Sequence, residues 1–284
     1  MSQGRTDQPP PRGDAGPSRT ADLEDARWRG PARRAPRPPK PPQPELLFLD
    51  EDLIVVDKPP GIVSAPGQGG ETAVEDLLRG RAGIPADAPF RIVQRLDKDT
   101  SGVIVYARTL DAQRRLTEQF EHRLVEKTYL ALVCGHVAED GEIDAAIEVD
   151  KRAHEVRISP RRGKPSRTRY RVLERLPGNT LLECRPLTGR THQIRVHLAS
   201  IGHPLSVDPT YGGGECLLLS HYKRKYRPNR SGEEKPLISR LTLHAARLAL
   251  NHPRTGERVV FEAPLPKDLR AAINQLRRAA AGRD

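Results

Sequence analysis

The apolar residues of this chain form regular patterns only from residue 45 onward. Two short apolar runs, Leu46 to Leu49 and Leu53 to Val56, flank the polar turn at residues 50–52, and this pattern predicts two paired strands. Similar runs predict further strands at residues 91–94, 103–107, 127–133, 167–175 and 180–185, and a hairpin over 241–263 that turns at 251–256. The chain is therefore expected to consist mainly of strands.

Four other segments carry apolar residues at helical spacing. The first is residues 72–81, with Thr72 as cap and Leu77 and Leu78 on its inner face, and the second is residues 110–120, with Leu110, Leu116 and Phe120 at helical spacing. The third is a helix capped by Thr191, with a buried stripe of Ile194, Leu198 and Ile201, and the fourth is a C-terminal helix with Leu269, Ile273 and Leu276 on one face. Strands and helices do not alternate regularly and no internal repeat is visible. This order predicts an α+β fold with a largely antiparallel sheet.

The first 44 residues differ from the rest in composition. They contain 11 Pro, 9 Lys or Arg and 5 Asp or Glu, and almost no apolar residues. Such a segment cannot bury enough surface to offset its loss of entropy on ordering. We expect a disordered basic arm over 1–44, either an inert tail or an RNA contact, and a catalytic domain over 45–284.

Charge and cysteine content narrow the class of protein. The 284 residues carry 48 Lys or Arg against 37 Asp or Glu, a formal net charge of +11, which favours a polyanionic partner. No apolar run approaches the roughly 18 residues of a membrane span, and the N-terminus has no signal-peptide pattern. The three cysteines, Cys134, Cys184 and Cys216, form no close-spaced pair. We expect a soluble, cytoplasmic protein without a disulfide scaffold or zinc ribbon.

The first candidate site is RLDKDTSG, residues 95–102, a polar loop between two predicted strands. Two carboxylates, two hydroxyls and a glycine in a loop can form a nucleophilic or acid–base site. A polar turn in which Asp and Thr cap backbone groups is the alternative.

The second candidate is LTGRTHQIRVHL, residues 187–198. Arg195 adjoins the apolar stripe of the predicted helix, so its guanidinium can turn inward only if a carboxylate meets it. Such a pair would hold an Asp ionised and oriented. The alternative is an ordinary helix with solvated basic residues. A metal site at His192, His197 and His203 is disfavoured because no acidic ligand lies at helical spacing.

The third candidate is HYKRKYRPNR, residues 221–230, in which five of ten residues are Lys or Arg and two are Tyr. This mixture is typical of surfaces that neutralise phosphates and stack bases. A solvated charged loop is the alternative.

Together these segments resemble the RluA-type pseudouridine synthases. The resemblance runs from about Phe48 to Pro266. Its segments, in the family's order, are VVDKPPG (55–61), RLDKDTSG (95–102), EKTYLALV (126–133), GKPSRTRY (163–170), LTGRTHQIRVHLASIGHPL (187–205) and LHA (243–245). It implies the α+β pseudouridine-synthase catalytic fold, a mixed, mostly antiparallel sheet flanked by helices around a central RNA-binding cleft. It also implies a monomer that isomerises uridine in structured RNA, rRNA or tRNA, without cofactor or metal.

The resemblance also implies roles for individual residues. The family's catalytic Asp falls on Asp97, its active-site Tyr on Tyr129, and the Arg that pairs with the carboxylate on Arg195. Arg95 matches the residue that enters the space left by the flipped uridine. The further RNA contacts expected are Lys127, Arg190, His192, Lys223, Arg224, Lys225 and Arg227.

The chain departs from the family pattern in three places. Gln94 stands where many members have His, the basic segment at 212–240 is longer, and the small N-terminal RNA-binding module of many relatives is absent. These differences leave the RNA target open. Two other functions remain as alternatives: a catalytically silent RNA-binding protein on the same scaffold, and a haloacid-dehalogenase-type phosphohydrolase suggested by Asp97-Lys98-Asp99.

Overall fold

One mixed sheet dominates the part of the chain that the computed structural model describes, residues 43–67, 69–81, 83–150, 155–223, 226–227 and 233–281. Its strands, with the separate hairpin β7–β8, are β1 (Glu45–Leu49), β2 (Leu53–Lys58), β3 (Arg91–Ile92), β4 (Ser101–Ala107), β5 (Glu126–Cys134), β6 (Gly141–Asp144), β7 (Ile147–Asp150), β8 (Glu155–Ile158), β9 (Arg167–Leu176), β10 (Asn179–Pro186), β11 (Leu243–Asn251) and β12 (Arg258–Glu262). The helices are α1 (Val74–Leu78), α2 (Leu110–Glu121), α3 (Gln193–Ser200), the 3-10 helix η1 (Leu219–His221) and α4 (Lys267–Ala281).

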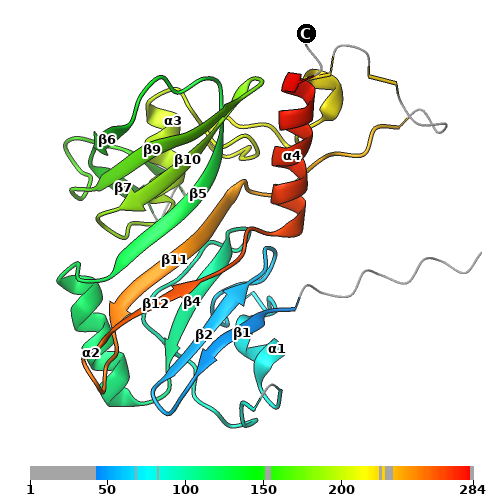
Figure 1. Ribbon diagram of the computed structural model, residues 1–284. Coiled ribbons are helices and arrows are strands. Elements are labelled where there is room, and N and C mark those ends of the chain that lie inside the picture. Colours follow the sequence, from blue (N-terminus) through cyan, green and yellow to red (C-terminus); the bar gives the residue numbers. More distant parts are fainter. Residues whose placement is uncertain are drawn as a thin grey trace, which may run out of the picture. The chain divides into compact units, whose positions relative to one another are not determined.

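The sheet has ten strands, in the order β1-β2-β4-β11-β5-β10-β9-β6, with β3 beside β4 and β12 beside β11. Among the named strand pairs only β4 and β11 are parallel; the others are antiparallel. The long strands β5 and β11 lie in the middle and connect a half with β1, β2 and β4 to a half with β10, β9 and β6 (Figure 1). The predicted α+β class with a mostly antiparallel sheet is confirmed.

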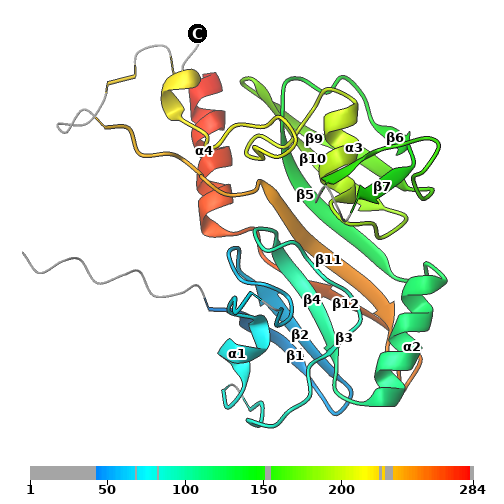
Figure 2. The ribbon, with the colours of Figure 1, turned by 180° about the vertical axis from the view of Figure 1, so that it is seen from behind.

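Helices cover both faces of the sheet. On one face, α1 packs over β2 and β4, and α3 packs over β10 and β9. On the other face, α2 and β12 cover the first half, and α4 covers the second (Figure 1). Figure 2 shows the face that carries α1 and α3. Tyr129 on β5 contacts both the α1 core and the α3 core. The centre of that face, between α1 and α3, is therefore the place where the two halves meet.

Most predicted elements are confirmed, including the hairpin β11–β12 and the apolar face of α4. The predicted helix 72–81 was too long. Val63 donates to Thr72 O and accepts from Val74 N, so residues 72–74 pair with Val63 and the helix begins only at Val74. Thr72 is therefore not its cap.

Two positions of the predicted helical patterns are exposed. Leu110 at the start of α2 is 68% exposed, and Ile201, just beyond the end of α3, is 38% exposed. Thr191 does not cap α3 either. His192 occupies the N-cap position with a left-handed backbone, and the side chain of Gln193 accepts from Arg190 N at 3.0 Å instead.

The segment 212–240 is anchored at its two ends. Leu217 and Ile238 pair through their backbones, and both are buried against α4. The predicted arm lies outside the described residues up to residue 42, so the boundary at residue 45 stays a prediction.

Candidate active site

An open pocket of about 1310 Å³ lies where the two halves meet on the α1–α3 face. Its lining is basic: Arg95, Lys98, Arg123, Lys127, Arg169, Arg185, Arg190, His192 and Arg195 contribute to it, against Asp97, Glu121 and Glu126. Several stretches distant in sequence form the pocket, among them the loop before β4, strand β5 and the chain leading into α3. Its size and charge suit a nucleotide within a polyanionic strand.

Asp97 lies in the loop between β3 and β4, and neighbouring backbone fixes that loop. Lys98 O accepts from Lys58 Nζ at 2.8 Å and from Gly61 N at 2.9 Å. Ser64 Oγ donates to Leu96 O at 2.8 Å and accepts from Leu96 N at 2.9 Å. The residues on both sides of Asp97 are thus held without any contact to its carboxylate.

Gly102 sets how close this loop comes to the centre of the sheet. It pairs with Ala245 of β11, and its φ of +116° is a backbone conformation that residues with a side chain rarely adopt. A Cβ at this position would lie 2.1 Å from Ala245 O. Glycine therefore permits the parallel contact of β4 with β11 that places Asp97 beside β5.

Lys58 is buried beneath the same loop. It is 0% exposed, and its Nζ donates to the carbonyl oxygens of Pro59, Ile62 and Lys98 at 2.8 to 3.0 Å. Burial lowers the pKa of Lys58 to about 7, and the charges of Asp99 and Asp97 oppose this shift. Three carbonyl acceptors match the three N–H donors of an ammonium group. Lys58 therefore connects the turn after β2 to the Asp97 loop.

Arg195 approaches Asp97 from the first turn of α3. Its Nη1 donates to Asp97 Oδ2 at 3.2 Å, while Nε and Nη2 donate to the two oxygens of Asp208 at 2.7 and 2.8 Å. Arg195 is 8% exposed and Asp208 0%. Burial opposes the charge of Arg195, but the hydrogen bonds and charges of Asp208 and Asp97 outweigh it and raise the pKa of the guanidinium. The inward Arg195 is thus held mainly by a carboxylate other than Asp97.

Asp208 is a site residue that the sequence analysis missed. A signal for it was present, because an inward arginine needs a carboxylate partner and Asp208 is the first acidic residue after Arg195 in the chain. It belongs to a tight turn over residues 206–214, in which Tyr211 N and Gly213 N donate to Asp208 O at 3.1 and 2.9 Å. A Cβ on Gly213 would lie 2.1 Å from Leu205 O, so glycine is needed for this close approach.

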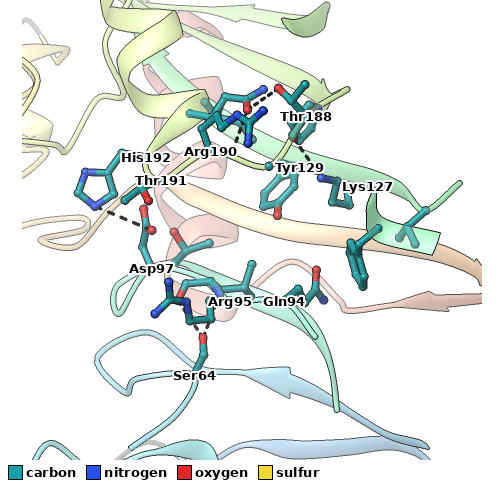
Figure 3. A pocket seen from close by; sticks show the side chains of 18 of the residues that line it. Ser64, Gln94, Arg95, Asp97, Lys127, Tyr129, Thr188, Arg190, Thr191 and His192 are labelled. Atoms are coloured by element: carbon teal, nitrogen blue, oxygen red, sulfur yellow. Dashed lines mark hydrogen bonds and ion pairs between the residues drawn. The ribbon is translucent and has the colours of Figure 1, made fainter. Parts of the chain in front are cut away.

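Tyr211 of the same turn contacts two further site residues. Its hydroxyl lies 2.8 Å from His192 Nδ1, and the guanidinium carbon of Arg195 lies 5.0 Å from the centre of its ring. His192 Nε2 in turn lies 3.9 Å from Asp97 Oδ1, and Figure 3 shows the imidazole facing that carboxylate. Asp97 is therefore flanked by a guanidinium on one oxygen and an imidazole on the other.

Strand β5 brings Tyr129 and Lys127 to the opposite wall (Figure 3). Burial, and then the negative charge of Asp97, raise the pKa of Tyr129 well above its ordinary value, so the phenol is protonated at neutral pH. Lys127 Nζ donates to Thr188 O at 3.1 Å, and burial lowers the pKa of Lys127 to about 8. Both side chains line the pocket that Asp97 faces.

The predicted RNA contacts fall into three groups. Arg95, Lys127, Arg190 and His192 line the pocket with Asp97, Tyr129 and Arg195. Lys223 and Arg227 are exposed and do not line it. Arg224 and Lys225 lie outside the described residues. Arg190 Nε and Gln94 Nε2 are buried and have no hydrogen-bond partner within the described part of the chain, which leaves two donors available in the pocket.

The other two histidines of the second motif have structural contacts. His197 bonds Thr168 Oγ1 and Ala145 O, and His203 bonds Cys134 O. Over the described residues, no three His, Cys, Asp or Glu side chains converge as metal ligands do. None of the described helices has the length and apolar character needed to cross a membrane.

Comparisons with known proteins agree with this fold and pocket. Residues 52–200 match the RNA pseudouridylate synthase family. The chain is 42% identical over 237 residues to ribosomal large subunit pseudouridine synthase D of Nitrosomonas europaea, which covers 82% of this chain and 65% of that relative. It is 40% identical over 238 residues to the protein of the same name from Xanthomonas campestris, covering 83% and 70%.

A solved structure agrees as well. The human RNA Pseudouridylate Synthase Domain Containing 1 is 31% identical, with a TM-score of 0.60 over 79% of this chain and 84% of that one. The mixed, mostly antiparallel sheet is thus the pseudouridine synthase fold. The chain belongs to the RNA pseudouridine synthase family, whose members are isomerases, and it spans about two thirds of the length of the curated relatives named above.

Proposed function

We propose that this chain converts uridine to pseudouridine in large-subunit ribosomal RNA and that Asp97 is its catalytic carboxylate. The observation that carries the proposal is the position of Asp97, which lies in the basic pocket with a buried guanidinium 3.2 Å from one oxygen. The names of the two relatives, each a ribosomal large subunit pseudouridine synthase, support the choice of substrate. Because the match covers 65% and 70% of these two relatives, we propose both the activity and the RNA target for this chain.

The reaction makes specific demands on the carboxylate. The N1–C1′ bond of the nucleoside breaks, the base turns and C5 bonds to C1′; C5 then loses a proton and N1 gains one, so no atom is gained or lost overall. Attack by a carboxylate, at the sugar or at the base, requires its anion. A guanidinium at hydrogen-bond distance stabilises that anion, and the Asp208–Arg195 pair keeps the guanidinium in place.

Tyr129 is suited to bind the uracil. Its ring faces the pocket from β5, and its raised pKa keeps the hydroxyl protonated. A neutral phenol offers an aromatic face for stacking and one O–H donor for a carbonyl of the base. We therefore assign Tyr129 to holding the turned base and relaying a proton, rather than to removing one as a phenolate.

The basic lining is suited to the RNA strand. A stacked uridine must leave the helix before its glycosidic bond can reach Asp97, and this costs a few kcal/mol. Cations that neutralise phosphates can offset that cost. Arg95 is exposed two residues before Asp97, where an inserted guanidinium could occupy the vacated position.

The test uses large-subunit rRNA transcripts whose uridines carry tritium at C5, because pseudouridine formation releases that hydrogen to water. Asp97→Asn should lower the rate more than about a thousandfold while RNA affinity changes less than about threefold. Asp99→Asn, a change of the exposed carboxylate two residues away, is the matched control and should stay near the wild-type rate.

Three outcomes would contradict parts of the proposal. Full activity of Asp97→Asn would remove the catalytic assignment. Release from tRNA but not from rRNA would change the target. Tight RNA binding by the wild type without any release would favour a silent RNA-binding protein.

A further inference from the structure

Tyr211 contacts both groups that flank Asp97, although the proposed chemistry gives it no task. Its hydroxyl reaches His192 Nδ1 at 2.8 Å, and the two rings meet edge to face with centres 5.7 Å apart. Its own face lies against the Arg195 guanidinium. The backbone bonds of the 206–214 turn fix its position. Tyr211 is therefore placed to control the orientation of His192.

The backbone of His192 is held in an unusual conformation. Its φ of 52° and ψ of 20° are left-handed, and within the described part of the chain Arg123 is the other non-glycine residue with a positive φ. Such a conformation costs about 1 kcal/mol or more and is kept where the surroundings impose it. Here it turns the imidazole toward Asp97, with Nε2 3.9 Å from Oδ1.

The surroundings of the imidazole determine which nitrogen carries the proton. An Nε2 lone pair aimed at a carboxylate would be repelled, whereas an N–H there is attracted. Burial, reinforced by Asp208 and Asp97 against the opposing charge of Arg195, raises the pKa of Tyr211 to about 12, so its hydroxyl has a proton to donate. Burial lowers the pKa of His192, which favours a neutral ring at neutral pH. Tyr211 O–H then donates to Nδ1 and leaves the proton on Nε2.

Several charged groups face this ring. The charges of Asp97, Arg195 and Asp208 all act on it. Glu155 and Arg157 of β8 line, together with His192 and Tyr211, a second cavity of about 370 Å³ behind the ring. Nδ1 of His192 is thus hydrogen-bonded to the Tyr211 hydroxyl, and Nε2 faces the carboxylate of Asp97.

We propose that Tyr211 is a positioning residue that holds His192 as the Nε2–H tautomer, and that His192 donates this N–H to Asp97 Oδ1 when RNA fills the pocket. Arg195 would then hold one oxygen of the carboxylate and His192 the other. A separation of 3.9 Å in the free protein is compatible with this, because hydrogen bonds of active sites often shorten only in the complex. The role of His192 rests on the function proposed for Asp97.

The direct test is the tautomer of His192 in the free protein, read from the ¹⁵N shifts of its ring and assigned by comparison with His192→Gln. Tyr211→Phe keeps the ring over Arg195 and removes only the hydroxyl. We expect Nε2–H in the wild type, and in Tyr211→Phe a mixture of tautomers with a raised His192 pKa, because the hydrogen bond to the neutral ring is lost. An Nδ1–H wild type, or an unchanged tautomer in Tyr211→Phe, would overturn the proposal.

Kinetics provide the second arm. Tyr211→Phe should lower kcat about tenfold with little change in KM, as expected for losing a hydrogen bond that acts through a charged group. Gln can offer its amide nitrogen near the place of Nε2, so His192→Gln should retain more activity than His192→Asn. In the His192→Gln background, Tyr211→Phe should have no further effect. Tyr170→Phe, a change on β9 of a tyrosine that does not line the pocket, is the control and should behave as the wild type.

Two kinetic results would overturn the proposal. One is a wild-type kcat in Tyr211→Phe, and the other is that Tyr211→Phe lowers kcat as much in the His192→Gln background as in the wild type. Failure of the proposed function is recognised separately. If Asp97→Asn stayed active, the donation to Asp97 would lose its purpose and that half of the proposal would be overturned. The tautomer measurement needs neither RNA nor turnover, so it judges the Tyr211 contact in either case.

Discussion

The two sides of the pocket are fixed by different kinds of interaction. On the Asp97 side, residues 58–64 and 94–102, the chain is held through backbone groups, with Lys58 and Ser64 bonding the carbonyls and amide around Asp97. On the Arg195 side, residues 188–195 and 206–214, it is held by charged side chains, above all the Arg195–Asp208 pair. The Asp97 side fixes the backbone from which the Asp97 carboxylate projects, and the Arg195 side fixes the position of the Arg195 guanidinium.

Because of this difference, substitutions on the two sides should affect stability and activity in different ways. Buried hydrogen bonds to backbone groups are little affected by salt, so changes on the Asp97 side should act mainly by moving the loop. A buried ion pair leaves an uncompensated charge when one partner is removed, so changes on the Arg195 side should cost both stability and activity. The following variants test this contrast, beginning with the largest expected effect.

The largest effect is expected for Arg195→Met. It leaves the Asp208 carboxylate, which is 0% exposed, without its partner, and the free energy of unfolding should fall by about 3–5 kcal/mol in urea denaturation. Pseudouridine formation should disappear, because Asp97 loses its guanidinium as well.

A double variant separates these two losses. Arg195→Met with Asp208→Leu removes both charges and should recover most of the stability, since a buried pair can often be replaced by apolar residues at little cost. It should not recover activity. If the double variant were active, Arg195 would not be needed for catalysis. If Arg195→Met were as stable as the wild type, the Arg195–Asp208 pair would not stabilise the fold.

Lys58→Met should give the next largest effect. Three carbonyl oxygens lose their donor, and the free energy of unfolding should fall by about 2–4 kcal/mol, measured again in urea. The rate should fall because the Asp97 loop moves. The salt dependence of RNA binding should stay the same, since the ammonium is fully buried.

Lys98→Met is the matched control for this experiment. Lys98 is exposed and pairs with Glu71 at the surface, so its loss should change stability by less than about 0.5 kcal/mol. Equal losses of stability in the two variants, or a changed salt dependence of RNA binding in Lys58→Met, would show that buried hydrogen bonds to backbone do not hold the Asp97 side.

The Asp97 side could largely be predicted from the sequence. Its loop lies between two strands with clear apolar patterns, and both Asp97 and Lys58, which holds the loop, belong to motifs that the sequence analysis singled out. Arg195 was also found, because it adjoins a helical stripe and matches a long family motif. Even so, the helix that carries Arg195 was given the wrong cap, since the left-handed turn at His192 depends on contacts that no local pattern encodes.

The rest of the Arg195 side could not be predicted in this way. Asp208 and Tyr211 lie in an irregular turn, and their importance arises only when the chain folds back onto α3. Periodicity is informative for helices and strands but not for such a turn. The signal that remained was chemical: a buried guanidinium needs a carboxylate, and the sequence offers Asp208 next.

Lys127 is expected to give the smallest effect, and it tests whether the Arg195 side senses pH. Its Nζ bonds Thr188 O on that side but has no carboxylate partner among the described ion pairs. With its pKa lowered to about 8, Lys127 is charged at pH 7 and loses its charge as pH rises through 8. RNA affinity should therefore weaken several-fold between pH 7 and pH 9, with the salt slope of binding smaller by about 1 if Lys127 neutralises one phosphate.

The titration of Lys127 should change the stability of the fold in the opposite direction to RNA affinity as pH rises. An unfolded lysine keeps its proton to about pH 10.4, so between pH 8 and that value the unfolded chain binds the extra proton and rising pH stabilises the fold. Weaker RNA binding above pH 8 would thus not reflect unfolding. Lys127→Arg stays charged over the whole range and should remove the pH dependence, whereas Lys127→Met should bind weakly at both pH values. If RNA affinity still depended on pH in Lys127→Arg, another group would cause that dependence, and the titration of Lys127 would not affect RNA binding on the Arg195 side.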